Sequence, residues 1–427
     1  MKILVACVGS RGDVQPYVAL GTGLQQAGHE VVIAADPTFR ELIVRTGLDF
    51  AEAQANPHQA LEKDIKQFGS NPLRVLRFIS EQFQRVAEEH FRDLFAASVG
   101  VEAIIISALA FAGLHVAEVL QIPVISTSLQ PIVGTRAFPY SISPILPEWV
   151  PFKGVYNRLS YRSTKIFLRL VFKSTNECRQ KILNLPPLPW KYYQKLDFGT
   201  YPFLYGYSAY VLPRPDDWPD TQHVTGYWFL NQQEAWQPPD DLVAFLEAGE
   251  TPVYIGFGSM VDRDAEDVTR LVVKALAMAG QRAVLLGGWA NLGETRLPDN
   301  IFKVNNIPHE WLFPRVKAVV HHGGAGTTAA GLRAGKPSVI IPFFGDQPFW
   351  GWRVHKLGVG PKPIPRKKLT SERLAQAINC AVRDQDIRAQ AKKLGEKIKA
   401  EDGVANAVGL INKLLQDPEP LIPRWDN

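Results

Sequence analysis

The chain has 427 residues, more than a single hydrophobic core usually serves, and this length suits two domains. Apolar residues make up 46% and charged residues 21%, as in soluble globular proteins, and a net charge of +5 is too small to indicate nucleic acid as a partner. Three widely separated cysteines, Cys7, Cys178 and Cys380, form neither a disulfide framework nor a metal cluster. The first residues resemble no secretory signal and no apolar run reaches membrane-spanning length, so we expect a cytoplasmic protein.

The first half of the chain alternates predicted strands and helices. Continuous apolar runs typical of buried parallel strands occupy residues 2–8, 30–35, 103–107 and 122–128. Between the first two runs we expect a helix that begins at Pro16, a favourable first-turn residue, and ends at Gly28. This βαβ order predicts a parallel sheet covered by helices on both faces.

Basic residues are concentrated between residues 153 and 181, where Glu177 is the single acid. Five of them are spaced by three or four residues and would form one stripe on a helix: Arg158, Arg162, Lys165, Arg169 and Lys173. Because Ile166 and Phe167 fall beside this stripe, one interpretation is an amphipathic helix that touches an anionic membrane peripherally. The alternative is a helix packed on the core with a solvated basic face.

The next segment changes character, and a second alternating series follows it. Residues 186–240 are rich in Pro, Trp and acidic residues, so we expect loops of the first domain and then an interdomain linker at about 214–250. Later strands are predicted at 251–259, 282–288, 301–306, 317–322 and 337–344.

These patterns predict an α/β fold with two tandem doubly wound parallel-sheet domains, Rossmann-like in topology, that face a cleft. The N-terminal domain is expected to span residues 1–215 and the C-terminal domain residues 216–405. Residues 406–427 are expected to form a terminal helix and tail that pack back on the first domain.

A glycine-rich junction, VVHHGGAGTT, overlaps the end of the predicted strand at 317–322. Ligands of doubly wound sheets gather at the carboxyl ends of strands, where amides at a helix N-terminus attract anions. The residues expected to face an anion are Gly324, Ala325, Gly326, Thr327 and Thr328, through backbone amides and the two threonine hydroxyls. His322 can donate an imidazole hydrogen bond to the same anion, whereas His321 is expected to face the fold. On its own, such a turn is weak evidence for a site.

Two further strand ends place polar groups at the same edge of the second sheet. Asp346 and Gln347 follow the strand at 337–344, and a carboxylate beside an amide offers acceptors and a donor for paired sugar hydroxyls. Gly258 and Ser259 end the first strand of this domain. Together, the three strand ends predict one site for a ligand that carries both phosphate and sugar groups.

Residues 321–351, HHGGAGTTAAGLRAGKPSVIIPFFGDQPFWG, closely resemble the nucleotide-sugar signature of family 1 glycosyltransferases of the GT-B fold. With GSRGDVQPYVALGTGL at residues 9–24, the chain is most similar to the sterol 3-beta-glucosyltransferase branch. The similarity covers nearly the whole chain and is weakest in 55–100 and 150–215. It implies an inverting enzyme that moves glucose from UDP-glucose to a lipophilic alcohol such as a sterol. Polyketides, flavonoids and carotenoids are the alternative acceptors.

The resemblance implies roles for individual residues in binding the donor. His322 and the amides of residues 325–328 would hold the diphosphate, with Ser259 nearby. Asp346 and Gln347 would hold hydroxyl groups of the glucose.

The uridine is expected to lie against NIPHEW, residues 306–311. Ile307 and His309 align with contacts that the plant relatives make to the base and the ribose. Asn306 stands where those relatives carry the tryptophan that stacks on uracil, so this chain departs from the family pattern there.

Asp13 is the candidate catalytic base, because transfer to an alcohol needs a group that accepts the hydroxyl proton. Plant relatives have a Gly-His-x-x-Pro pattern where this chain has Gly12-Asp13-Val14-Gln15-Pro16, so a carboxylate replaces the imidazole. The alternative is that Asp13 only caps the helix expected to begin near Pro16, which is a common role for aspartate.

Metal ions are not expected at the site. Asp262 and Asp264 have the spacing of a metal-binding Asp-x-Asp pair, but acids at this place commonly begin a helix. A helix dipole and His322 already oppose the charge of a leaving diphosphate. We therefore expect a donor substrate, UDP-glucose, and no metal or other cofactor.

Two proteins of other classes remain as alternatives. A nicotinamide-dependent oxidoreductase would use Gly9 and Gly12 for a pyrophosphate and Asp36 for a ribose, but the full Gly-x-Gly-x-x-Gly fingerprint is missing. A non-catalytic UDP-sugar-binding protein on the same scaffold would not need Asp13.

The acceptor pocket is expected in loops of the first domain, in residues 126–149 and parts of 55–100. The first of these loops carries the apolar and aromatic residues Phe138, Tyr140, Ile142, Ile145, Leu146 and Trp149. They suit a flat hydrophobic acceptor, although such residues equally suit packing between the domains. The oligomeric state is not indicated by the sequence.

Overall fold

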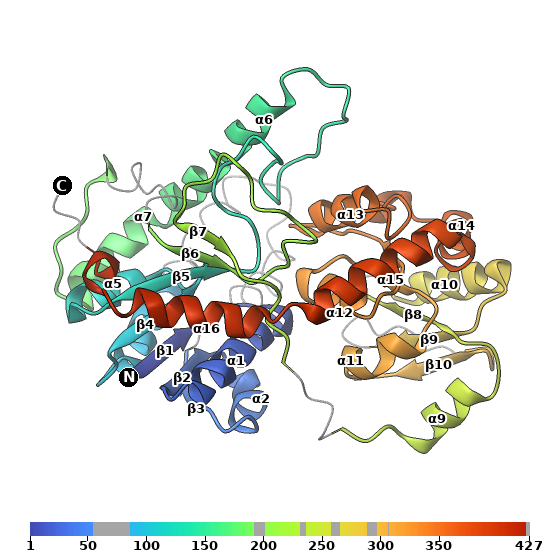
Figure 1. Ribbon diagram of the computed structural model, residues 1–427, viewed down its shortest axis with the longest axis horizontal. Coiled ribbons are helices and arrows are strands. Elements are labelled where there is room, and N and C mark those ends of the chain that lie inside the picture. The colour runs from blue at the N-terminus through green and yellow to red at the C-terminus, as the bar shows by residue number, and fades with distance from the viewer. Residues whose placement is uncertain are drawn as a thin grey trace.

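The structure is a computed structural model that describes residues 1–53, 86–191, 201–230, 236–257, 265–287, 297–305 and 307–423. It contains two parallel sheets, one in each half of the chain, with helices packed around both (Figure 1). The prediction of an α/β fold with two Rossmann-like domains in tandem is confirmed.

Among the described residues, the first sheet has seven strands, all parallel to their neighbours. They are β1 (Lys2–Ala6), β2 (Glu30–Ala35), β3 (Asp49–Glu52), β4 (Ala103–Ser107), β5 (Val124–Ser128), β6 (Phe203–Tyr205) and β7 (Gln222–Val224). Across the sheet they run in the order β3-β2-β1-β4-β5-β6-β7. The four predicted strands are β1, β2, β4 and β5, which are almost wholly buried because helices cover both faces.

Three strands at or next to the edges of this sheet are not among those that the sequence predicts. β6 and β7 have only three residues each, too few to show a periodicity, and β3 begins and ends with an acid. Since β7 ends at Val224, the first sheet extends beyond residue 215, where the sequence analysis puts the domain boundary. The proline-rich segment thus contains the last two strands of the first sheet, and the linker follows them.

The helices of the first domain are α1 (Arg11–Gln26), α2 (Arg40–Val44), α5 (Ala112–Leu120), α6 (Lys153–Ser160) and α7 (Ser163–Lys181). The start expected for the first helix, Pro16, is wrong, because α1 begins five residues earlier with Ser10 as its N-cap. Pro16 lies inside the helix, where it removes only the bond that its N–H would donate to the carbonyl of Gly12. That carbonyl faces the second domain, close to Gly326.

The second sheet has five parallel strands in the order β10-β9-β8-β11-β12. They are β8 (Val253–Gly256), β9 (Ala283–Leu286), β10 (Ile301–Val304), β11 (Val319–His321) and β12 (Ser338–Ile340), and each lies within a predicted strand. The helices are α9 (Asp240–Glu247), α10 (Ala265–Ala279), α11 (His309–Leu312), α12 (Ala325–Arg333), α13 (Gln347–Lys356), α14 (Ser371–Arg383) and α15 (Gln385–Ala400).

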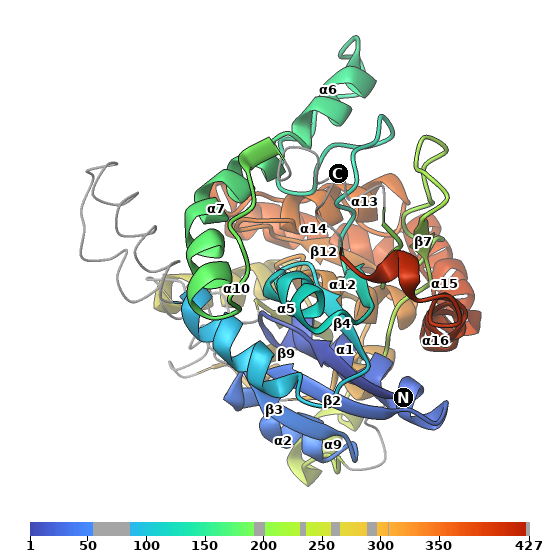
Figure 2. The same cartoon turned by 90° about the vertical axis from the view of Figure 1, so that its left-hand side faces the viewer.

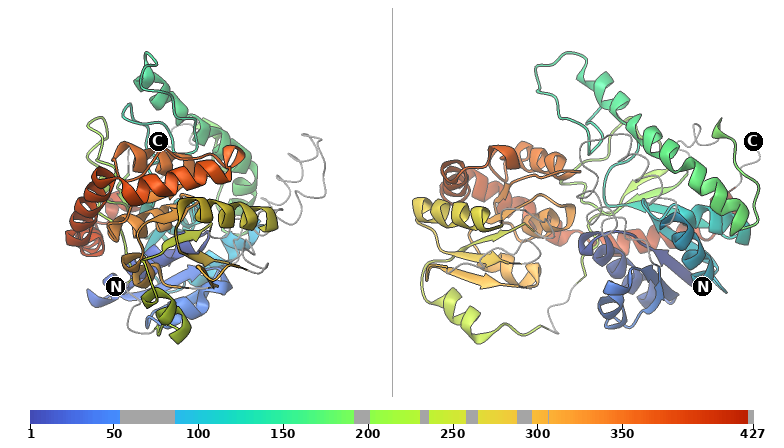
Figure 3. Two further views of the ribbon diagram at one scale, coloured as in Figure 1. Left: turned by 90° about the vertical axis from the view of Figure 1, so that its right-hand side faces the viewer. Right: turned by 180° about the vertical axis from the view of Figure 1, so that it is seen from behind.

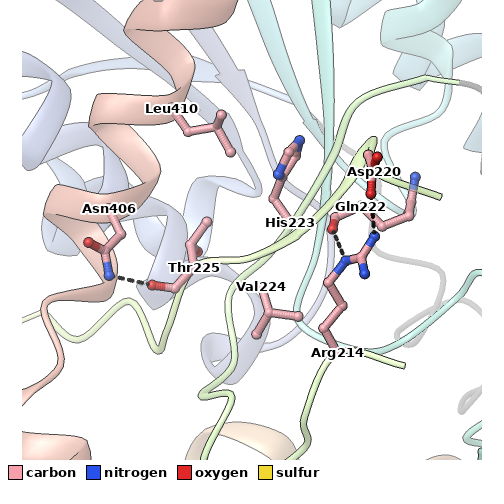
Figure 4. A pocket seen from close by; sticks show the side chains of 8 residues that line it. All are labelled: Arg214, Asp220, Gln222, His223, Val224, Thr225, Asn406 and Leu410. Atoms are coloured by element: carbon pink, nitrogen blue, oxygen red, sulfur yellow. Dashed lines mark hydrogen bonds and ion pairs between the residues drawn. The ribbon is translucent and has the colours of Figure 1, made fainter. Parts of the chain in front are cut away.

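The last helix, α16 (Gly403–Leu414), lies on the first domain although it follows the second in sequence (Figure 1). Its residues Ala407 and Ile411 are buried in the core that surrounds β1 and α1. The two helices approach closely, since a Cβ at Gly23 of α1 would lie 2.4 Å from a methyl group of Val404. Asn406 also donates a hydrogen bond of 3.0 Å to the carbonyl of Thr225 beside β7, at the edge of a small polar pocket (Figure 4).

Aromatic contacts join the two domains on the side of α13. Phe138 packs edge-on against Phe349, with ring centroids 5.8 Å apart, and Tyr207 packs against Trp350 at 6.3 Å. Lys356 forms an ion pair of 3.4 Å with Glu148 of the first domain. Phe138 is therefore part of the packing between the domains. Over the described part of the chain, no helix combines the length and apolar character that crossing a membrane requires.

The basic residues between 158 and 173 do not form one stripe on one helix. Arg158 belongs to α6, whereas Lys165, Arg169 and Lys173 belong to α7, and Arg162 lies at the junction. All five side chains are exposed. The expectation of a single helix is wrong because the chain turns at Tyr161, whose side chain is buried.

Candidate active site

The N-terminus of α12 lies where the sequence predicts an anion site. Its N-cap is Gly324, which has no side chain to bond the first amides of the helix. The amides of Ala325, Gly326 and Thr327 have no acceptor within the helix, as at any helix start. Thr328 differs from the expectation, because its N–H and its hydroxyl both donate to the carbonyl of Gly324, each at 2.9 Å. Three amides, rather than four, face outward.

His322 lies beside this helix start. A Cβ at Gly324 would be 2.5 Å from Nε2 of His322, so only glycine leaves room for the ring in this position. Nδ1 of His322 is buried and has no hydrogen-bond partner in the structure. Burial lowers the pKa of His322 to about 4, so the imidazole is neutral at pH 7. The preceding His321 is fully buried and accepts a bond of 3.1 Å from the amide of Gly323, so it faces the fold as expected.

Asp13 occupies the corresponding helix start in the first domain. It is the third residue of α1, and its Oδ2 accepts from the backbone N–H of Ser10 at 2.8 Å and from the Ser10 hydroxyl at 2.9 Å. This is the N3 arm of a capping box, so Asp13 does have a capping role, although at a different position from the one expected. Gly9, with φ of +140°, makes room for the carboxylate, because a Cβ there would lie 2.5 Å from Oδ2.

The two helix starts face each other, and they differ in charge. A Cβ at Gly326 of α12 would lie 3.4 Å from the Cα of Gly12 of α1. The negative charge of Asp13 already offsets the positive end of the α1 dipole, whereas α12 has no acid in its first turn. A second anion is therefore favoured at α12 and opposed at α1. Of the two helix starts, the one in the second domain is therefore better suited to a phosphate group.

Asp346 lies between the domains. Its Oδ2 accepts a hydrogen bond of 2.9 Å from the amide of Gln130 in the first domain and one of 2.7 Å from the indole of Trp350. Burial raises the pKa of Asp346 to about 6, and the negative charge of Asp13 adds to the rise. The carboxylates of Asp13 and Asp346 thus belong to the same region. Gln130 is absent from the predicted site, although its position just after β5 is a signal that could have indicated it.

Gln347 has a structural contact that the sequence does not reveal. Its Oε1 accepts from the backbone amides of Phe343 at 2.8 Å and Phe344 at 3.3 Å, and its side chain is buried. The carbonyl oxygen is thereby used to shape the loop between β12 and α13. The expected role of this oxygen in binding a sugar differs from what the side chain does here.

The residues expected near a nucleoside lie at the start of α11 and just before it, and α11 contacts α12. His309 stacks on Phe313 with ring centroids 4.4 Å apart, and Ile307 is buried in the same apolar cluster. Burial, with smaller contributions from the positive charges of Arg11 and of protonated His322, lowers the pKa of His309 to about 4. Arg11 of the first domain therefore lies near His309, and the sequence analysis does not include it in the site.

Several predicted residues lie outside the part of the chain that the structure describes. They are Gly258, Ser259, Asp262, Asp264 and Asn306.

The residues of the nicotinamide alternative are already used by the protein. Oδ1 of Asp36 accepts from the amide of Thr38 at 3.0 Å and from its hydroxyl at 2.6 Å, which caps a short 3₁₀ turn. A pyrophosphate at Gly9 would meet the carboxylate of Asp13. Both observations disfavour a dinucleotide in the first domain.

Comparisons with known proteins find a match to a glycosyltransferase domain model in each half of the chain. Residues 3–139 match the model of the glycosyltransferase family 28 N-terminal domain, and residues 284–414 match that of the erythromycin biosynthesis protein CIII-like C-terminal domain. A sterol 3-beta-glucosyltransferase of Arabidopsis thaliana is 38% identical over 419 residues, which are 96% of this chain and 64% of that protein. One of Aspergillus clavatus is 38% identical over 434 residues, which are 99% of this chain and 30% of that protein.

The fold is also that of glycosyltransferases. The crystal structure of the kitacinnamycin glycosyltransferase superposes with a TM-score of 0.70 at 21% identity, over 96% of this chain and 98% of that one. This chain covers less than two thirds of the length of the curated relatives. The two halves thus match the N-terminal and C-terminal domain models of glycosyltransferases, the fold is GT-B, and the chain resembles the sterol 3-beta-glucosyltransferase branch.

Proposed function

We propose that the protein transfers glucose from UDP-glucose to the hydroxyl group of a lipophilic alcohol, with a sterol as the first candidate, and that the anomeric configuration is inverted. The observation that carries the proposal is the open, uncharged start of α12 opposite the start of α1 that holds Asp13. The names of the curated relatives support glucose and a sterol.

The donor diphosphate binds at the start of α12. The amides of Ala325, Gly326 and Thr327 donate to the phosphate oxygens, and the helix dipole favours their charge. His322 is neutral at pH 7, so it contributes one imidazole N–H rather than a full positive charge. The uridine extends toward His309. This arrangement stabilises the leaving UDP without requiring a metal ion.

Asp13 is the base for the acceptor hydroxyl. The hydroxyl oxygen forms a bond to C1 of glucose as the bond from C1 to the diphosphate oxygen breaks. The hydroxyl proton passes to Asp13, and UDP leaves with the electron pair. Because the base lies in the first domain and the diphosphate in the second, attack comes from the face opposite UDP, which inverts C1.

Asp346 holds glucose hydroxyls from the side of the second domain. Gln130 orients its carboxylate through the bond to Oδ2, so both domains contribute to the sugar site. Because burial, and to a smaller extent the charge of Asp13, disfavours the ionised form, Asp346 retains its proton at a higher pH than an exposed aspartate does.

The acceptor binds on the side of the first domain, and its lipophilic character leads us to propose peripheral contact with an anionic membrane. Of the aromatic residues expected to form the acceptor pocket, Phe138 packs between the domains and Tyr140 packs on Tyr161 with ring centroids 5.4 Å apart. Other hydrophobic natural products remain alternative acceptors.

Incubation with UDP-glucose and a series of sterols and other lipophilic alcohols tests the proposal. We expect a sterol glucoside with a β linkage, identified by mass spectrometry and NMR. UDP-glucose binding without transfer to any alcohol would instead indicate a sugar-nucleotide-binding protein. Thermal stabilisation by NAD but not by UDP would indicate the oxidoreductase.

The pH dependence of kcat/KM for UDP-glucose should report the ionisation of Asp346. Its carboxylate accepts hydroxyl bonds only when ionised, so kcat/KM is expected to fall as the pH drops through about 6. The raised pKa also means that Asp346 favours the folded state below its unfolded value of 3.8 and loses this contribution as the pH rises through about 6.

The matched variant is Asp346→Asn, which keeps the shape of the side chain. It should lower kcat/KM at neutral pH and remove the limb near pH 6, and it should change the ratio of UDP-glucose to UDP-galactose and UDP-xylose use. An unchanged limb and unchanged donor ratios would argue against Asp346 as a sugar-binding residue.

A further inference from the structure

The short helix α6 and the loop before it project from the body of the molecule in every view (Figures 1, 2 and 3). Large apolar side chains are unusually exposed there: Ile142 by 56%, Trp149 by 82%, Phe152 by 84%, Val155 by 50% and Leu159 by 44%. Phe152, Val155 and Leu159 are spaced by three and four residues, so they lie on one face of α6. We call these five residues the α6 wedge.

The opposite face of α6 is polar, and it holds the helix to the protein. Asn157 is buried, and its amide donates a bond of 2.9 Å to the carbonyl of Arg136. The hydroxyl of Tyr156 donates to the carbonyl of Pro144 at 2.6 Å, and the hydroxyl of Ser160 accepts from the amide of Tyr140 at 2.8 Å. A helix on the surface of a soluble domain normally buries its apolar face. In α6 this orientation is reversed.

The backbone conformation at the start of α6 also keeps the apolar face of the helix outward. Phe152, the N-cap of α6, has φ of +57°, a left-handed conformation that bulky residues rarely adopt. The strain does not bury the ring, since this is the most exposed side chain of the wedge. Several exposed apolar side chains on one projecting segment of a soluble protein mark a surface that binds something.

Most of the charges around the wedge are positive, although the carboxylate of Asp217 accepts a bond of 2.8 Å from the backbone amide of Arg136. Arg136, Arg158 and Arg162 are exposed near it, and the exposed basic residues of α7 continue from the same junction. Glu148 is the only acid between residues 136 and 173 in the sequence. It is paired with Lys153 at 3.0 Å and with Lys356 at 3.4 Å. The surroundings of the wedge therefore attract anions.

We propose that the α6 wedge inserts into the interfacial layer of an anionic lipid bilayer. Aromatic and aliphatic side chains enter the boundary between headgroups and acyl chains, and the surrounding arginines bind the lipid phosphates. The wedge is a narrow projection, which a fluid bilayer can surround but which buries little area against a rigid protein surface. The same tip with few acids suits lipid headgroups better than a second copy of this chain.

The position of the wedge links it to the active site. Ser141, at its base, donates a bond of 3.1 Å to Gln130, and Gln130 in turn donates to Asp346. A membrane held by the wedge thus lies next to the acceptor side of the site. The delivery of a lipophilic acceptor from the bilayer rests on the proposed function, whereas membrane binding by the wedge does not.

Cosedimentation with vesicles tests the proposal on the full chain. The protein should bind vesicles of phosphatidylcholine with phosphatidylserine at least tenfold more tightly than vesicles of phosphatidylcholine alone. A double variant with Trp149→Ser and Phe152→Ser should lose at least tenfold in affinity for the mixed vesicles. Charge reversal by Arg158→Glu and Arg162→Glu should remove the preference for phosphatidylserine. The matched control is Val99→Ser, which changes another exposed apolar residue and should bind like the parent.

A spectroscopic readout identifies the inserted residue. Vesicles with brominated acyl chains should quench part of the tryptophan fluorescence of the parent, and Trp149→Phe should lose this quenching while it still binds. Melting temperatures show whether the variants are folded.

Equal binding by the parent and the wedge variant, absence of binding by the parent, or equal affinity for both kinds of vesicle would overturn the proposal. A concentration-dependent dimer that the wedge variant loses would show that a second copy covers the wedge instead. Vesicle binding that depends on the wedge, without glucose transfer in any assay, would overturn the proposed function but leave this inference standing. Glucose transfer in detergent, together with vesicle binding that the wedge variant keeps, would overturn this inference and leave the proposed function standing.

Discussion

Replacement of Asp13 with asparagine is expected to lower glucose transfer by about 10²–10⁴-fold, the usual contribution of a positioned base. The asparagine keeps an oxygen that accepts from the amide of Ser10, so the start of α1 should survive. UDP affinity and melting temperature should change little, because the diphosphate site lies on α12. Turnover under conditions limited by chemistry, UDP binding and thermal unfolding are the measurements.

The capping role of Asp13 makes a second variant necessary. Asp13→Ala removes both the base and the cap, so it should also cost about 0.5–2 kcal/mol of stability. Asp384, the N-cap of α15, is the matched control, because it accepts a bond of 3.0 Å from the amide of Ile387 far from the site. Asp384→Ala should lose similar stability and keep its turnover per folded molecule. Near-normal turnover of Asp13→Asn would show that another group accepts the proton.

A carboxylate placed at Gly326 should abolish binding of the donor. At about 4 Å and an effective dielectric constant of about 20, two unit charges repel by about 4 kcal/mol. Gly326→Asp is therefore expected to bind UDP and UDP-glucose on the order of 10²–10³-fold more weakly than Gly326→Asn, which has nearly the same size. The substitution fits, since a Cβ at this position meets the Cα of Gly12 at 3.4 Å.

The effect of this substitution on stability should have the opposite sign. An acid in the first turn of a helix interacts favourably with the dipole, by about 0.3–1 kcal/mol. Gly326→Asp should thus unfold at a temperature equal to or above that of Gly326→Asn while losing the ligand. Calorimetric titration and thermal unfolding of both variants test this pair of expectations. Equal UDP affinities of the two variants would show that the phosphate does not lie at the start of α12.

The sequence by itself determined nine of the twelve strands that the structure describes, and the glycine-rich turn before α12. β1, β4, β8 and β11 are mainly apolar, because a parallel sheet with both faces covered favours such residues. The glycines before α12 likewise predict the tight turn that the structure has. Gly323 has φ of +92°, and a Cβ there would lie 2.7 Å from a methyl group of Ile340, so the turn admits no other residue without strain. Local rules of this kind act within a few residues.

The tertiary structure alone decided which polar groups remain available. The bond from Gln130 to Asp346 joins residues that are 216 positions apart, and no local pattern pairs them. The side chains of Thr328 and Gln347 look suited to a ligand in the sequence, but nearby carbonyl and amide groups use them in the fold.

Local sequence patterns also fail to show which face of α6 is exposed. Its periodicity shows that the helix has an apolar and a polar face, and a helix in isolation gives no reason to bury the polar one. Only the packing of Asn157 against the carbonyl of Arg136 turns the polar face inward and leaves Phe152 outside. The orientation of an amphipathic helix depends on the free energy of every group that it touches, and those groups come from distant parts of the chain.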